Sequence, residues 1–104
     1  MIRILALILI WLCWSAGQAQ AASIERGRAY ARTHCARCHA IDRTASSPLP
    51  AAPAFRTLHE RYPVEALEES LAEGIVTGHA EMPEFRLEPD QISDFIAFLK
   101  SLER

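Results

Sequence analysis

Three scarcities in the 104-residue chain limit what the protein can be. Both tryptophans and one of the three cysteines lie within the first 14 residues, which leaves residues 22–104 with no tryptophan and with only Cys35 and Cys38. If these two neighbouring thiols serve one local site, no further thiol remains to form a structural disulfide. Lys100 is the single lysine, and the formal net charge is −2. That balance argues against nucleic acid as a partner.

A long hydrophobic run is also missing. The apolar stretch Ile4–Trp14 follows the positive residue Arg3 and is much shorter than the ~20 residues that a membrane-spanning helix needs. Ala19-Gln20-Ala21 then supplies a small-x-small cleavage site. We therefore predict that residues 1–21 are a cleaved signal peptide and that residues 22–104 are exported to the periplasm with no permanent membrane span. Cleavage after Ala19 and an uncleaved membrane anchor are the alternatives.

The pattern of residues 22–104 is helical. No alternating strand pattern or Asn-Gly hairpin signal occurs. Ser23 is a suitable N-cap for a helix over 24–34, and Pro63 and Gly74 suit the two ends of a helix over 63–73. A third helix, over 89–102, has apolar residues at three- and four-residue steps: Ile92, Phe95, Ile96, Leu99 and Leu102. We expect one all-α domain whose core is small enough to need further stabilisation by a disulfide, a metal or a bound cofactor.

Residues 35–39 read Cys-Ala-Arg-Cys-His, the attachment motif of a c-type haem. Cys35 and Cys38 would each add to one vinyl group of a single haem c, and His39 would ligate the iron. A zinc site would need a second, distant ligand pair, and a thioredoxin-like dithiol would need a βαβ setting; neither is present in the sequence. A disulfide between the two cysteines is a further alternative, but it would leave the core small.

Met82 is the only methionine of residues 22–104, and it lies between two predicted helices with Pro83 directly after it. Iron held by His and Met is typical of electron-transfer cytochromes. We predict His39 and Met82 as the two metal ligands. His79, three residues earlier, is the rival sixth ligand, and a gap-filling methionine in the core is the other alternative.

On Cys35-Ala36-Arg37-Cys38-His39 and Met82-Pro83, the chain resembles the class I cytochrome c family. The resemblance implies a cytochrome c-like fold in which N- and C-terminal helices pack against each other around one covalent haem. Gly27, eight residues before Cys35, would touch the C-terminal helix. The carbonyl of Pro53, with Pro50 as an alternative, would accept a hydrogen bond from His39, since haem-ligating histidines usually donate their second N–H.

The resemblance also implies the function. The chain would be a monomeric one-electron carrier between redox proteins such as a dehydrogenase, reductase or oxidase, and not an enzyme. A haem-based sensor, a small peroxidase and a fixed subunit of a larger oxidoreductase are the alternatives. With a single lysine, a lysine-rich docking ring is missing, and arginines 26, 28, 32 and 37 are the candidate replacements.

Further candidates for the haem pocket are apolar or able to bind a propionate. Arg56 and Tyr62 are the candidate propionate partners. The candidate apolar lining comprises Phe55, Leu58, Leu67, Leu71, Ile75, Phe85, Phe95, Ile96 and Leu99.

Overall fold

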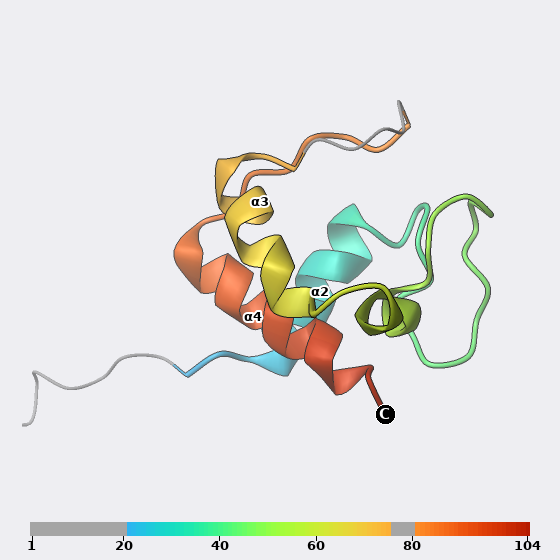
Figure 1. Cartoon of the computed structure of the whole chain (residues 1–104), viewed down its shortest axis with the longest axis horizontal. Coiled ribbons are helices and arrows are strands. Elements are labelled where there is room, and N and C mark those ends of the chain that lie inside the picture. The colour runs from blue at the N-terminus through green and yellow to red at the C-terminus, as the bar shows by residue number, and fades with distance from the viewer. Residues whose placement is uncertain (1–20, 76–80) are drawn as a thin grey trace, which may run out of the picture.

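The computed structural model describes residues 21–75 and 81–104, and this part of the chain consists of helices and loops (Figure 1). No strand occurs among the described residues, so the all-α prediction is confirmed. None of the described helices is long and apolar enough to cross a membrane. In chain order the elements are α2 (Ile24–His34), the 3-10 helices η1 (Phe55–Glu60) and η2 (Val64–Ala66), α3 (Leu67–Glu73) and α4 (Pro89–Ser101).

The contact between α2 and α4 joins the two ends of the domain (Figure 1). It is closest at Gly27, where an added Cβ would lie 2.1 Å from the carbonyl oxygen of Asp94 and 2.7 Å from Cβ of Phe98. One turn later on the same face of α2, Ala31 is fully buried. The expected packing of the terminal helices is therefore confirmed, and it depends on small residues in α2.

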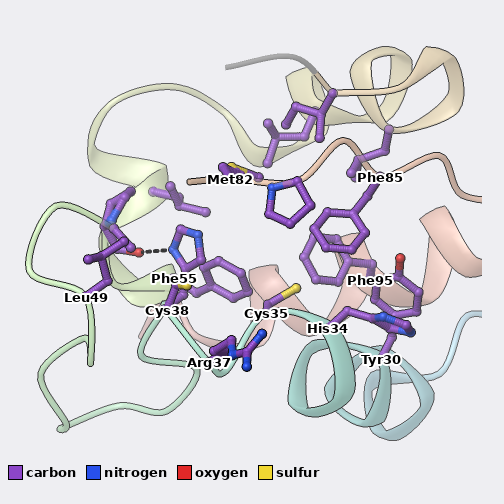
Figure 2. A pocket seen from close by; sticks show the side chains of 18 of the residues that line it. Tyr30, His34, Cys35, Arg37, Cys38, Leu49, Phe55, Met82, Phe85 and Phe95 are labelled. Atoms are coloured by element: carbon purple, nitrogen blue, oxygen red, sulfur yellow. Dashed lines mark hydrogen bonds between the residues drawn. The ribbon is translucent and has the colours of Figure 1, made fainter. Parts of the chain in front are cut away.

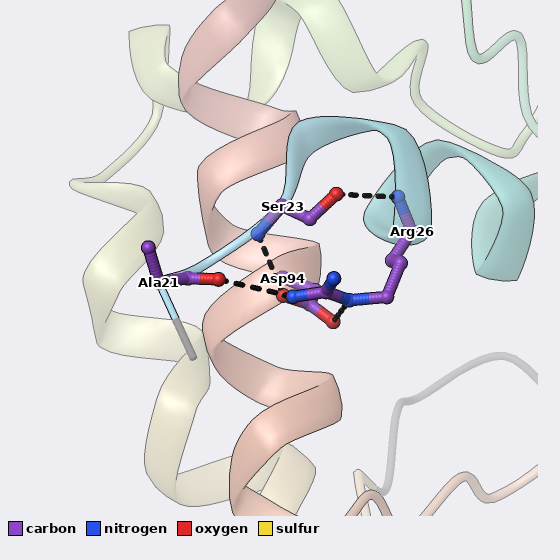
Figure 3. Close-up of polar contacts among 4 residues, drawn as sticks. All are labelled: Ala21, Ser23, Arg26 and Asp94. Atoms are coloured by element: carbon purple, nitrogen blue, oxygen red, sulfur yellow. Dashed lines mark hydrogen bonds and ion pairs between the residues drawn. The ribbon is translucent and has the colours of Figure 1, made fainter. Parts of the chain in front are cut away.

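A polar contact at the start of α2 reinforces this packing (Figure 3). The carboxylate of Asp94 on α4 accepts hydrogen bonds from the backbone N–H of Ser23 at 2.7 Å and from Nε of Arg26 at 2.8 Å. Arg26 also donates from Nη2 to the carbonyl of Ala21 at 3.0 Å. The Ser23 hydroxyl accepts from the backbone of Arg26, as expected of an N-cap. Arg26 therefore joins the start of α2 to α4.

The middle of the chain differs from the prediction of one helix over 63–73. Pro63 is extended, with φ −60° and ψ 131°, and caps the short 3-10 helix η2 instead of starting an α-helix. The chain becomes α-helical at Leu67. The predicted end is right, because Gly74 stops α3 with a φ of +105°. The 3-10 helix η1 was not predicted, since six residues at three per turn give no clear α-helical period.

The core lies between α4 and the elements that cover it. Its largest fully buried side chains are Phe98, Leu99 and Val64. Ile96 is also buried in this cluster. The other side of α4, together with the end of α2, faces a cavity.

Candidate functional site

A cavity of about 610 Å³ lies between the end of α2, the proline-rich loop (residues 44–54), α3 and the segment that carries Met82 (residues 81–87) (Figure 2). Its volume falls within the ~300–1,000 Å³ of typical ligand pockets. The five predicted site residues all line it: Cys35, Cys38, His39, Pro53 and Met82. Segments far apart in the sequence thus bring two thiols, an imidazole and a thioether to one cavity.

The two cysteines reach the cavity because the chain continues past α2 as a tight turn. The N–H of Cys35 donates to the carbonyl of Ala31 at 2.8 Å, and the N–H of His39 donates to the carbonyl of Cys35 at 2.9 Å. This turn places both sulfurs on the cavity side, and both are free thiols. Burial raises the pKa of the Cys35 thiol to about 11, so the group is neutral at physiological pH.

His39 is held in one tautomer. Its Nδ1 lies 2.8 Å from the carbonyl oxygen of Pro53. Because a carbonyl only accepts, Nδ1 carries the proton and donates it, which leaves the lone pair on Nε2 for a metal. The ring also packs against Phe55, with centroids 4.8 Å apart. This is the hydrogen bond that the resemblance implied, and metal-ligating histidines usually make one of this kind.

The proline-rich loop is held where it can supply that carbonyl. Its backbone is tied to the motif at two points: Leu49 donates to the carbonyl of Cys38 at 3.1 Å, and Phe55 donates to the carbonyl of Ala40 at 3.0 Å. Pro50, the alternative acceptor, is exposed and does not line the cavity. Pro53 is therefore the residue of this loop that contacts His39.

Met82 lies on the opposite side of the cavity from Cys35 and Cys38 (Figure 2). The rival ligand His79 lies outside the described residues. Two thiols suited to thioether bonds, one imidazole with a free Nε2 and one soft thioether form the donor set of a haem c with His and Met ligands. The residues present therefore fit this group, although their binding to iron stays a prediction.

The apolar lining largely agrees with the candidates from the sequence. Phe55, Leu58, Leu67, Leu71, Ile75, Phe85 and Phe95 line the cavity. Ile96 and Leu99 do not, because they lie in the core behind it. Phe95 makes edge-on contacts with Tyr30 at 5.9 Å and with Phe55 at 5.8 Å between centroids, so the wall is a chain of aromatic rings.

The polar rim differs from the prediction. Arg56 does not line the cavity, since its Nη1 donates to the carbonyl of Ala45 at 2.7 Å within the neighbouring loop. Arg61 lines the cavity instead, and Tyr62 does so as predicted. The missed signal is the spacing Phe55, Leu58, Arg61: on a 3-10 helix, residues three apart share one face.

The alternative of a protein-only metal site finds no support in the described residues. Within 21–75 and 81–104, no three His, Cys, Asp or Glu side chains are grouped so that they could hold a metal ion. A zinc site at the cysteine motif would need such a group.

A family model described as Cytochrome c matches residues 24–103, from the first residue of α2 to beyond the end of α4. Searches of curated proteins and of solved structures find no match.

Proposed function

Because the chain belongs to the cytochrome c family, we propose that it is an exported monohaem electron carrier. The observation that carries the proposal is the meeting of Cys35, Cys38, His39 and Met82 at one cavity. Members of this family bind haem c and use it for electron transfer. The number of haems follows from the single attachment motif in the sequence.

Each residue of the site has a role in this proposal. Cys35 and Cys38 would hold the haem through thioether bonds, and His39 and Met82 would ligate its iron. The haem supplies a one-electron couple at that iron. With His39 and Met82 both bound to the iron, and with aromatic and aliphatic side chains lining the cavity, no ligand position would remain open to a substrate. For this reason we propose a carrier and not an enzyme.

Partners and location complete the proposal. The carrier exchanges electrons as a monomer with redox proteins such as a dehydrogenase, a reductase or an oxidase. The exposed arginines Arg37 and Arg61 line the cavity and support docking of an acidic partner surface near its mouth. The signal-like sequence of residues 1–21 supports export to the periplasm.

The first experiment tests covalent attachment in the protein purified from an exporting host. Haem should remain with the chain through acid-acetone extraction. The Cys35→Ala and Cys38→Ala double variant should yield little folded holoprotein. Haem that extracts freely from the wild-type protein would contradict the proposal.

The second experiment separates a carrier from a sensor or peroxidase. The oxidised carrier should show the absorption band at the red end of the visible spectrum that accompanies a methionine–iron bond. The reduced carrier should not bind carbon monoxide readily. Ready binding of carbon monoxide by the wild-type protein would instead favour an open iron site. Size-exclusion chromatography of the native protein from its own host distinguishes a free carrier from a fixed subunit.

A further inference from the structure

The segment that carries Met82 is joined to the end of α3 by backbone hydrogen bonds. The N–H of Ile75 donates to the carbonyl of Phe85 at 3.1 Å, and the N–H of Leu87 donates to the carbonyl of Leu71 at 2.8 Å. Phe85 and Leu87, which follow Met82, therefore lie against the end of the helix that precedes it. Residues 76–80 lie outside the described residues.

Arg86 adds a side-chain bond to this junction. Its Nε and Nη2 both donate to the carbonyl oxygen of Glu73, the last residue of α3, at 3.1 and 2.9 Å. A helix leaves its last carbonyls without backbone partners and has a partial negative charge at this end. A guanidinium there satisfies a carbonyl and is electrostatically favourable. Arg86 thus caps α3 from a point four residues beyond Met82.

The returning chain fits closely against the helix end. Gly74 adopts a φ of +105°, and a Cβ on it would lie 2.2 Å from Oε1 of Glu84. Glu84 and Gly74 are therefore in direct contact next to the Arg86 bond. This junction is one of the described contacts that fix the position of residues 81–87, which carry Met82. Phe85 adds a second contact, because its ring packs edge-on against His34 of α2 with centroids 5.9 Å apart.

We propose that Arg86 is a positioning residue that keeps Met82 at the sixth coordination position of the iron. The inference rests on the proposed function, since it takes Met82 as the axial ligand. An external ligand can replace Met82 only when this segment moves away from the haem, and such local opening costs less than global unfolding. The guanidinium bonds to Glu73 favour the state in which residues 81–87 lie against α3 and Met82 is bound to the iron. Loss of these bonds therefore raises the population of the state in which Met82 has moved away.

The test is a titration of the oxidised holoprotein with imidazole, followed by loss of the methionine–iron absorption band. Arg86→Ala removes both bonds to Glu73. We expect imidazole to bind roughly fivefold more tightly, which corresponds to about 1 kcal/mol, the net value of a typical hydrogen bond. Arg86→Lys keeps one donor and the positive charge at the helix end, so it should restore part of the difference.

A matched control separates positioning from general stability. Arg26→Ala removes the two hydrogen bonds that the guanidinium donates to Asp94 and the one that it donates to the carbonyl of Ala21, all at the α2–α4 contact away from Met82. It should lower the stability of the fold and leave the affinity for imidazole within twofold of the wild-type value.

The outcomes are distinguishable. Equal imidazole affinity in Arg86→Ala and wild type, with the band present in both, overturns the role of Arg86 and leaves the proposed function standing. The same increase in Arg26→Ala as in Arg86→Ala also overturns it, because the effect then follows global stability. Absence of the band in the wild-type protein overturns Met82 as ligand and, with it, the role of Arg86.

Discussion

Gly27 is the point where α2 and α4 come closest, and Gly27→Ala should destabilise the holoprotein. The added Cβ would lie 2.1 Å from the carbonyl oxygen of Asp94, 2.7 Å from the carbonyl carbon and 2.7 Å from Cβ of Phe98. None of these atoms can rotate away, because two belong to the backbone of α4 and the third is attached directly to it. The two helices would therefore have to separate by about 1 Å to reach an ordinary contact.

The size of the effect follows from two opposing contributions. Inserting a group into a well-packed contact costs about 1–3 kcal/mol and sometimes more. Here the upper end applies, since the separation would also loosen the fully buried Ala31 and Phe98. Alanine in place of glycine within a helix contributes roughly 1 kcal/mol in the opposite direction. We expect a net loss of about 2 kcal/mol in the free energy of unfolding.

Urea unfolding of the holoprotein, followed by far-ultraviolet circular dichroism, measures this loss. With a slope of about 1 kcal/mol per molar urea for a small domain, the midpoint should fall by about 2 M. Ala29→Gly is the matched control, because Ala29 is exposed on the same helix and reports the helix propensity alone. A Gly27→Ala protein as stable as the wild type, or more stable, would refute the close approach of the two helices.

Three further predictions concern the ligand, the acid dependence and the mature chain. Met82→Ala should abolish the low-spin His/Met spectrum, lower the reduction potential and open the iron to cyanide. His79→Ala should change these properties little. Optical spectra of the two variants distinguish the ligands, and the reverse result would identify His79 as the ligand. The hydrogen bond from Arg26, followed by that from the backbone of Ser23, lowers the pKa of Asp94. The stability that ionised Asp94 contributes is thus complete above its unfolded pKa of ~3.9 and is lost as the pH falls through its lower folded pKa. Asp94→Asn should therefore weaken the acid dependence of urea unfolding below about pH 4. An unchanged dependence would contradict the pairing of Asp94 with Arg26. The intact mass of the exported protein should equal a chain that starts at Ala22 plus one haem, and a mass that includes residues 1–21 would show an uncleaved anchor instead.

Features that depend on neighbouring residues were predictable from the sequence. The cysteine motif is recognised by its spacing alone. Ser23 and Gly74 are residue types that begin and end helices, and the apolar residues of α4 repeat at helical steps. Gly27 could be predicted to contact the last helix only with the help of the family resemblance, because a glycine near a helix start is also tolerated without any contact. Its partners on α4 become visible only when the two helices are placed side by side.

The partners of long polar side chains could be identified only from the tertiary structure. Arg56 and Arg61 both follow Pro53 closely in the sequence. The 3-10 geometry of η1 places Arg61 in the lining of the cavity, whereas Arg56 donates to the carbonyl of Ala45 in the neighbouring loop. The pairing of Arg26 with Asp94, 68 positions further along the chain, likewise cannot be read from the sequence around Arg26. A long side chain can reach many acceptors, and its own neighbours in sequence do not select one.

By itself, the sequence determined the kind of site: two thiols and an imidazole in one motif, a single methionine far along the chain, and helices to carry them. These follow from residue types and short spacings, which act within a turn or two of the chain. The family resemblance offered both Pro53 and Pro50 as the partner of His39, and only the tertiary structure decided for Pro53. Only the tertiary structure showed that Arg86 reaches the end of α3. Such contacts join residues that are 13 or 14 positions apart through loops, and the path of a loop depends on the whole packed domain.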